Sequence, residues 1–323
     1  MAKQPVARPK VRIGARGSKL SLAQTRQVQA RIALALGASP EDADAVAPIV
    51  VITTSGDRIQ DRRLLEIGGK GLFTKEIEEA LLDGRIDCAV HSLKDMPGEL
   101  PPGLVIAATP EREDPRDAFM SVNHAGFDAL PPGARLGTAS LRRQAQALAR
   151  RPDLDIVMTR GNVDTRLAKL ERGEADAILL ALSGLKRLGL GHLPREILDP
   201  VACPPAPGQG ALAIETRADL AGAAWLAAIH HHPTALAVAA ERGALVALEG
   251  SCRTAIGAYA QVDQDGLRLV VEALTPDGRE RFRREASLAL AGEGDEARAR
   301  QLGLALGGEI REEGGDRLLL PET

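Results

Sequence analysis

The most restrictive feature of the sequence is a two-part pattern that occurs twice in the same order. In its first part, an apolar stretch, a glycine and a hydroxyl residue precede a helix rich in Gln and Arg, at 12–32 and again at 135–151. In its second part, a helical stretch is followed by G-x-x-D and a buried strand that ends at a serine, at 75–92 and 165–184. Alternating strands and helices predict an α/β layer structure. Two copies therefore predict two similarly built α/β lobes with a ligand-binding cleft between them.

Length and composition fit a globular protein with several domains. The 323 residues are 44% hydrophobic and 26% charged, which is typical of a soluble protein with two or three domains. The longest strongly apolar run, at 177–182, is too short to span a bilayer, and the basic start has no apolar signal-peptide core. We therefore expect a cytoplasmic protein with no membrane partner. We also expect a monomer, which these features do not themselves show.

Charge and cysteine content exclude several other classes. A net charge of -3, with one Trp, one Tyr and four Phe, argues against a nucleic-acid partner. The three cysteines, Cys88, Cys203 and Cys252, have no C-x-x-C spacing, so neither a disulfide framework nor a zinc site is indicated. Arginines nevertheless cluster in particular loops, which predicts local anion sites.

The last part of the chain predicts a smaller α+β domain. A helical stretch at 234–250 is followed by strand-like segments at 255–262 and 267–274, and by a final helix around 296–311. The histidine run before it, at 230–232, suggests a loop or a helix cap. Three consecutive side chains of a regular helix cannot all face one metal ion.

Two loops combine arginine with small hydroxyl residues at a helix start. Backbone N–H groups and the helix dipole favour an anion there, and arginine binds carboxylate or phosphate in a bidentate way. The candidates are Arg16 and Ser18 in the first loop, and Ser140, Arg142 and Arg143 in the second. The alternative is ordinary N-capping by serine beside solvated arginines.

A third cationic segment follows the predicted strand at 155–159. Arg160 and Arg166 would lie at the same sheet edge as the 138–144 loop if the lobe has a parallel sheet. Like charges ~4 Å apart at an effective dielectric near 20 repel by about 4 kcal/mol. A ligand with several carboxylates or phosphates would relieve that repulsion.

The segment HSLKD, at 91–95, supplies a base and a cation at a strand end. Asp95 is a candidate general acid or base, and Lys94 is a candidate to hold an anion or to tune that carboxylate. The alternative for both is a solvated turn pair. We expect His91 to be a hydrogen-bonded core residue.

For two further segments, the local sequence is compatible with more than one role. Three glycines surround Lys70 at 68–73, but the G-x-x-x-x-G-K-[ST] phosphate loop is absent, so we expect a mobile lid. Cys252, within LEGSCRTAIG at 248–257, is either a small apolar filler or a nucleophile.

Together these segments resemble the porphobilinogen deaminase family, also named hydroxymethylbilane synthases. HSLKD and LEGSC are the most specific of the matching motifs. The matches follow the family's order over nearly the whole chain: ARGSKLSLAQ, GGKGLFTKEIE, AVHSLKDMP, EREDPRDAF, GTASLRRQAQ, RRPDL, RGNVDTRLAKL, GLKRLGL, PAPGQGALAIE and LEGSCRTAIGAY.

The resemblance implies an α/β fold with two lobes like those of type II periplasmic binding proteins, a cleft between them, and a small C-terminal α+β domain. It also implies that the segment after PAPGQG completes the first lobe. We expect the first lobe at 1–110 plus 208–228, the second at 111–207, and the C-terminal domain, with the cofactor cysteine, at 229–323.

The resemblance also implies a chemistry. Cys252 would carry a dipyrromethane cofactor through a thioether, and four porphobilinogens would be condensed onto it with loss of ammonia before hydrolysis to hydroxymethylbilane. Asp95 would be the catalytic residue, and no metal would be used. The implied cofactor- and substrate-binding residues are Arg16, Ser18, Lys94, Ser140, Arg142, Arg143, Arg160, Arg166, Arg187 and Gln209, with Lys70 and Phe73 in the lid loop.

Three positions depart from the family pattern. Ala255 stands where the family often has proline, Ser55 where many members have arginine, and Glu66 where some have lysine. These changes put in question the rigidity of the cysteine loop and any role for a cation at positions 55 and 66.

Two other classes of protein compete with this interpretation. A solute-binding or effector-sensing module shares the two-lobe plan, but it needs neither a proton-transferring carboxylate nor a nucleophilic thiol. A cysteine-dependent acyl transferase would need a histidine base matched to Cys252, and the sequence does not place His91 there.

Overall fold

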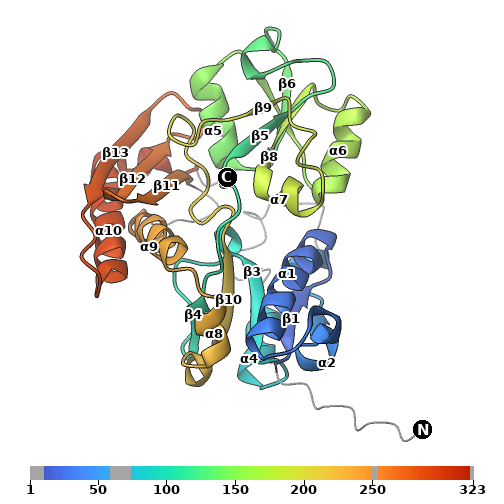
Figure 1. The fold of residues 1–323 in the computed structure, drawn as a ribbon. Helices are drawn as coiled ribbons and strands as arrows, with labels where there is room; N and C mark the ends of the chain where they lie inside the picture. Colours follow the sequence, from blue (N-terminus) through green and yellow to red (C-terminus); the bar gives the residue numbers. More distant parts are fainter. Residues whose placement is uncertain (1–10, 59–73, 249–253, 321–323) are drawn as a thin grey trace, which may run out of the picture. The chain divides into compact units, whose positions relative to one another are not determined.

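The computed structural model describes residues 11–58, 74–248 and 254–320. They form two compact units, each built from more than one stretch of the chain. The first unit contains 11–58, 74–112 and 211–232, and the second contains 113–210 and the described residues from 233 onward. Figure 1 shows the elements of both units.

The first unit contains a five-stranded mixed sheet. Its strands are β1 (Ile13–Arg16), β2 (Ile49–Ile52), β3 (Cys88–Ser92), β4 (Leu104–Ala108) and β10 (Leu212–Arg217). They lie in the order β2-β1-β3-β10-β4. β1 pairs in parallel with β2 and β3, and β10 is antiparallel to both β3 and β4. A late segment of the chain therefore completes the first sheet, as the resemblance implies.

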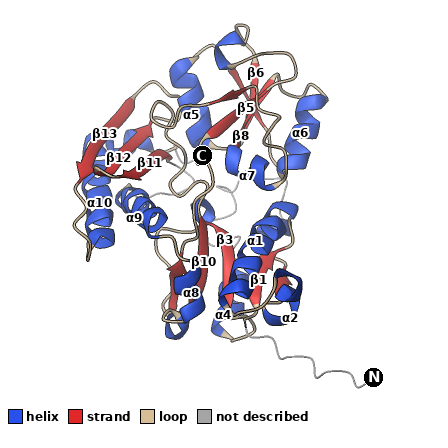
Figure 2. Cartoon of the chain, in the orientation of Figure 1, coloured by secondary structure: helices blue, strands red, loops and turns tan. Residues whose placement is uncertain are grey.

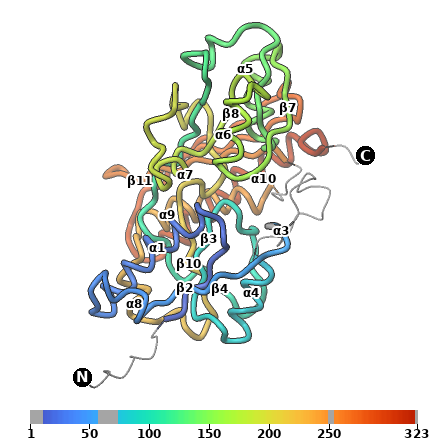
Figure 3. The backbone as a smooth tube through the Cα atoms, turned by 90° about the vertical axis from the view of Figure 1, so that its right-hand side faces the viewer, coloured from blue at the N-terminus to red at the C-terminus, as the bar shows by residue number. Residues whose placement is uncertain are grey.

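Helices pack against both faces of this sheet. They are α1 (Lys19–Ala35), α2 (Ala43–Val46), α3 (Ser55–Arg58), α4 (Lys75–Leu82) and α8 (Ala224–Ile229). Side chains of a strand alternate between the two faces. Cys88 and Val90 of β3 therefore join a core with α1 and α8, whereas Ala89 packs with Ile77 and Leu81 of α4. Figure 3 shows α8 beside α1.

The second unit begins with a sheet of the same plan. Its strands are β5 (Asp117–Met120), β6 (Arg135–Thr138), β7 (Asp155–Met158), β8 (Ala177–Ala181) and β9 (Glu196–Ile197), in the order β7-β6-β8-β5-β9. β6 is parallel to β7 and β8, and β5 is antiparallel to β8 and β9. The helices are α5 (Leu141–Arg150), α6 (Val163–Glu171) and α7 (Leu182–Arg187). The repeated sequence pattern thus corresponds to two sheets of equivalent strand order.

The G-x-x-D part of the repeat has a physical explanation. Asp87 accepts hydrogen bonds from the backbone N, Nε and Nη2 of Arg12, at 2.7, 3.0 and 2.7 Å. Asp176 accepts from the same three atoms of Arg135, at 2.8, 3.4 and 3.0 Å. In both lobes the aspartate therefore joins the helix–strand connection to the start of the neighbouring parallel strand.

The rest of the second unit is a small α+β domain. An antiparallel sheet of β11 (Ala255–Asp263), β12 (Gly266–Leu274) and β13 (Arg281–Leu288) packs with α9 (His232–Ala247) and α10 (Asp295–Gly314), as Figure 2 shows. In the turn between β12 and β13, Gly278 has a φ of +73°, and a Cβ there would collide with the backbone of α5 at Ala145. The turn therefore lies directly against the second lobe.

The predicted fold class, two α/β lobes followed by a small α+β domain, is confirmed. The predicted helices and strands named above are present within a few residues of their expected ends. β13 was not predicted, because its sequence RFRREASL has three consecutive charged residues and no continuous apolar run. Short 3-10 helices lie at Pro40–Asp42, Leu93–Asp95, Phe127–Ala129, Ala218–Leu220 and Gly315–Leu318.

None of the helices in the described part of the chain has the length and apolar character needed to cross a membrane.

Candidate active site

The turn that carries Asp95 is held by buried apolar residues on either side. β3 runs into a 3-10 helix at Leu93–Asp95, where Leu93 and Met96 are 1% and 3% exposed. The N–H of Leu93 donates to the Ala211 carbonyl at 3.1 Å, and that of Met96 donates to the Leu93 carbonyl at 3.1 Å. Asp95 is exposed and Lys94 is partly exposed. The turn therefore presents the Asp95 carboxylate to solvent at the carboxyl end of β3.

Arg16 and Ser18 lie at the same end of the first sheet, because β1 and β3 are parallel. Arg16 is the last residue of β1 and is partly exposed. Ser18 is the N-cap of α1, and its Oγ accepts a hydrogen bond from the Ser21 N–H at 3.2 Å. Ser18 can both cap the helix and bind an anion, because a capping hydroxyl accepts through its oxygen and keeps its own proton to donate to an anion.

The second lobe repeats this arrangement. Ser140 is the N-cap of α5, and its Oγ accepts from the Arg143 N–H at 3.4 Å. Asn162 is the N-cap of α6, and its side chain accepts from the Thr165 N–H at 2.9 Å. These two helices follow the parallel strands β6 and β7, so both helix starts lie at one edge of the second sheet.

Three arginines of the second lobe have a buried donor atom without a hydrogen-bond partner among the described residues. These atoms are Nε of Arg142, Nη1 of Arg160 and Nε of Arg187. Arg187 donates through Nη2 to the Gly210 carbonyl at 2.8 Å, and burial lowers the pKa of Arg187 to about 10. Arg166 donates through Nε to the Gly161 carbonyl at 2.9 Å. Cations that lack a full set of acceptors are suited to bind carboxylates.

Arg142, Arg143 and Gln209 lie deeper than the sequence suggests, and Asp117 is their common partner. Nη1 of Arg142 and Nη2 of Arg143 lie 2.8 and 2.7 Å from the Asp117 carboxylate, and both arginines are 5% exposed. Gln209 is fully buried and donates through Nε2 to Asp117 at 2.8 Å and to the Pro115 carbonyl at 2.7 Å. These three side chains therefore surround a buried carboxylate.

Asp117 itself is a functional candidate that the sequence reasoning missed. Burial raises the pKa of Asp117, but the charges and hydrogen bonds of Arg142 and Arg143 outweigh burial and hold that pKa well below its usual range. The signal was the aspartate that opens the apolar strand DAFM in EREDPRDAF. That motif contributed to the family resemblance, but no binding or catalytic role was assigned to Asp117 within it.

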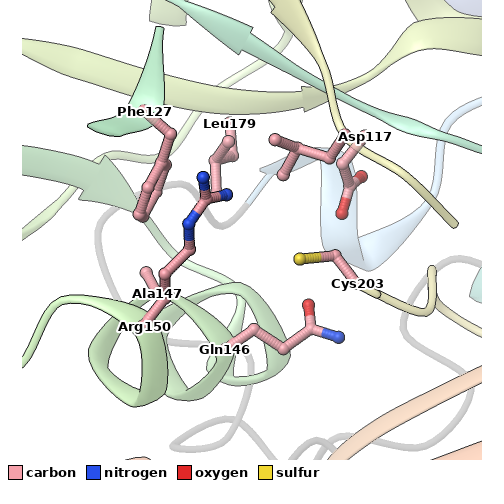
Figure 4. A pocket seen from close by; sticks show the side chains of 8 residues that line it. Asp117, Phe127, Gln146, Ala147, Arg150, Leu179 and Cys203 are labelled. Atoms are coloured by element: carbon pink, nitrogen blue, oxygen red, sulfur yellow. The ribbon is translucent and has the colours of Figure 1, made fainter. Parts of the chain in front are cut away.

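The two cysteines that the structure describes are poor nucleophiles. Burial raises the pKa of Cys88, which is fully buried, and also that of Cys203. Figure 4 shows Cys203 in a small pocket with Asp117, Gln146 and Arg150. Because the thiolate is the reactive form, neither cysteine suits covalent attachment. Cys252, Lys70, Phe73 and Glu66 lie outside the described residues.

The other singled-out positions have structural contacts. Ser55, at the start of α3, donates to the Glu76 carboxylate through its backbone N–H at 2.8 Å and through its hydroxyl. Ala255 is fully buried and pairs with Leu274 in the C-terminal sheet. In the histidine run, His231 donates its N–H to the Thr109 carbonyl at 2.8 Å just before α9 begins. This confirms the loop and helix-cap interpretation of that run.

Comparison with known proteins identifies the family of the chain. The profile for the porphobilinogen deaminase dipyromethane cofactor-binding domain matches residues 11–224, and that for the porphobilinogen deaminase C-terminal domain matches 235–312. Porphobilinogen deaminase of Caulobacter vibrioides (strain NA1000 / CB15N) is 72% identical over 318 residues, covering 97% of this chain and 99% of that one. The protein of the same name from Caulobacter sp. (strain K31) is 70% identical over 323 residues, covering all of both chains.

Among solved structures, an ABC transporter periplasmic substrate-binding protein from Coxiella burnetii is similar at a TM-score of 0.41, with 16% identity over 72% of this chain and 96% of that chain. The family profiles and the high identity to the two Caulobacter proteins establish that this chain belongs to the porphobilinogen deaminase family.

Proposed function

We propose that this chain is a hydroxymethylbilane synthase, a transferase of tetrapyrrole biosynthesis. It would condense four porphobilinogens, each losing ammonia, onto a dipyrromethane primer attached to Cys252, and then release hydroxymethylbilane by hydrolysis. The observation that carries this proposal beyond family membership is the placement of Asp95. It is an exposed carboxylate on a turn fixed by buried Leu93 and Met96.

The described residues fit a ligand with many carboxylates. Porphobilinogen has an acetate and a propionate group, so every addition brings two more negative charges. Arg160 and Arg187 each have a buried donor atom without a partner in the described part of the chain, and carboxylate oxygens would satisfy those donors. A bound dipyrromethane supplies the pyrrole carbon from which the chain grows. We propose that Arg16, Ser18, Lys94, Ser140, Arg160, Arg166 and Arg187 bind these acid groups.

Arg142, Arg143 and Gln209 complete the proposed binding set. Each already contacts Asp117, which favours a supporting contribution over direct contact with ligand.

We further propose that Lys70 and Phe73 belong to a lid loop.

We propose that Asp95 transfers and stabilises charge at the reacting carbon. Ammonia leaves the aminomethyl group of porphobilinogen as a C–N bond breaks, and the methylene carbon left behind is electron-poor. A carboxylate beside it stabilises that positive charge. After the new C–C bond forms, the ring carbon of the growing chain must lose a proton, and the same carboxylate is a suitable base.

The domain boundaries and the cellular setting are also proposals. We propose a first lobe at 1–110 plus 208–228, a second at 111–207 and a C-terminal domain at 229–323. We also propose a monomer that acts in the cytoplasm, without a nucleic-acid or membrane partner.

The intact mass of the purified protein tests the covalent attachment. The expected mass exceeds that of the polypeptide by one dipyrromethane. The excess is absent in Cys252→Ser and present in the matched control Cys203→Ser. An unmodified protein that consumes porphobilinogen at full rate would overturn the proposal.

Asp95→Asn tests the catalytic assignment. Turnover of porphobilinogen should be nearly lost while far-UV circular dichroism and the melting temperature stay as in the wild type, because Asp95 is exposed. Glu99→Gln, an exposed acid four residues further on, is the control and should keep its activity. Near-normal turnover in Asp95→Asn would remove Asp95 from this role.

A further inference from the structure

A cluster of buried ionisable side chains lies directly behind the Asp95 turn. It consists of Glu78 on α4, His91 on β3 and Glu215 on β10, which are 9%, 6% and 0% exposed. His91 is the penultimate residue of β3, four residues before Asp95. The proposed function uses none of these three side chains.

Strand register places His91 and Glu215 on one face of the sheet. His91 pairs with Ala213 and Glu215 pairs with Ala89, so the two side chains are diagonal neighbours on the face that α4 covers. Nε2 of His91 lies 3.0 Å from Oε2 of Glu215. The pair therefore joins β3 to β10 two residues before the turn begins.

Several polar atoms of this cluster have no hydrogen-bond partner among the described residues. Oε1 of Glu78, Nε2 of His91 and both Glu215 oxygens are buried without a partner in hydrogen-bond geometry among the described residues. The His91–Glu215 contact is within salt-bridge distance. Leaving a buried carboxylate without a partner costs several kcal/mol, and His91 is the side chain that lies against Glu215.

Other charges near the cluster do not replace His91. Burial raises the pKa of Glu78 and the Glu215 carboxylate adds to that rise, while the nearby Thr74 side chain and His91 oppose it. Arg217, on the same face of β10, donates to the carbonyls of Leu81 and Ile86 at the far end of α4.

The remaining neighbouring strands contribute little charge. On β1, Gly14 faces the α4 side, so Arg16 faces that side at the strand end. β4 contributes no charged residue, and Lys94 lies in the turn itself.

We propose that His91 and Glu215 are positioning residues for Asp95: the pair holds the end of β3 against β10 and so fixes where the turn presents the Asp95 carboxylate. This inference rests on the proposed function. The backbone supports it, because the turn is bonded to the same strand connection through the Leu93 N–H and the Ala211 carbonyl, at 3.1 Å. A misplacement of ~1 Å in a reacting group lowers the rate by about a hundredfold.

The test uses His91→Gln, Glu215→Gln and the double variant, each purified with its cofactor and checked by intact mass. In both single variants, kcat should fall about ten- to a hundredfold while KM for porphobilinogen stays within about twofold, because the binding arginines are untouched. His91→Gln should lose more, because it removes the side chain that lies against the buried Glu215 carboxylate. The double variant should recover part of that loss, since no unpaired charge remains at position 215.

Asp87→Asn is the matched control, since Asp87 immediately precedes β3 and contacts Arg12 outside the cluster. It should weaken the first lobe and leave kcat of the loaded enzyme unchanged. Single variants with the kcat of this control, or a double variant as slow as His91→Gln, would overturn the inference. A wild type that neither carries dipyrromethane nor consumes porphobilinogen would overturn the proposed function, and this inference with it.

Discussion

At the scale of single residues, the buried Asp117 carboxylate is the centre of the second lobe's polar core. Two guanidinium groups and one amide converge on it, and its low pKa shows that the charged form is strongly favoured in the folded protein. Removing the carboxylate would leave two buried arginines without a counter-charge. A residue that no local motif singled out therefore has the largest expected effect on stability.

Asp117→Asn is expected to lower the free energy of unfolding by about 3–5 kcal/mol at pH 7. Because the folded-state pKa is depressed, this stabilisation is complete above the unfolded-state value of about 3.9 and is lost as pH falls below it. Urea unfolding of wild type and variant between pH 7 and pH 3 measures the difference, which should shrink below about pH 4. Asp153→Asn, which breaks an exposed pair with Arg151, should change stability little. An equally small change for Asp117→Asn would show that the buried pairs contribute nothing net.

At the scale of elements, the N-cap of α6 is a position where helix capping and local charge can be changed independently of each other. Asn162 accepts the Thr165 N–H, and it lies between Arg160 and Arg166 in sequence. Aspartate caps a helix as well as asparagine does but adds a negative charge. This position can therefore report on anion binding without a change in fold.

Asn162→Asp should keep the melting temperature and raise KM for porphobilinogen several-fold, because the new charge competes with substrate carboxylates for the two arginines. Asn162→Ala should have the opposite profile, with a loss of ~1 kcal/mol in unfolding free energy and a smaller change in KM. Thermal unfolding and steady-state kinetics on both variants make the comparison. An unchanged KM in Asn162→Asp would argue against Arg160 and Arg166 as ligand-binding residues.

The elements also show where sequence reasoning succeeds. Apolar periodicity predicted β1, β3, β6 and β8 because each is largely buried, and for β3 and β8 the helix that ends near a glycine just before the strand is a further local signal. β13 was missed because this edge strand is rich in arginine and has no continuous apolar run. The partners of Arg142 and Arg143 were missed for a different reason. Asp117 is more than twenty residues away, and only the β5–β8 pairing brings it to α5.

At the scale of the whole molecule, Glu241 connects several parts of the second unit. It lies on α9, is fully buried, and accepts from the Gly208 N–H at 2.6 Å and the Ala260 N–H at 2.8 Å. A second buried link runs from Gln146 of α5 to Glu272 of β12 at 3.0 Å. We therefore expect the second lobe and the C-terminal domain to unfold together.

Glu241→Gln tests this cooperativity. Replacing one acceptor oxygen by a donor leaves a buried N–H without a partner, at a cost of about 1–3 kcal/mol. Calorimetry should show a single unfolding transition for the second unit in the wild type. In the variant, that transition should occur at a lower temperature or split into two. Glu285→Gln, on the exposed face of β13, is the control and should unfold as the wild type does. Two separate transitions already present in the wild type would contradict the expectation.

The glycine turn between β12 and β13 has a practical consequence for engineering the protein. From its sequence, TPDGRE is an ordinary hairpin tip, the kind of site usually chosen for an epitope tag. Gly278 instead lies against the backbone of α5, so inserted residues there would separate the C-terminal domain from the second lobe. The hairpin between β11 and β12 has an exposed tip at Gln264 and Asp265 and should accept the same tag without loss of soluble expression.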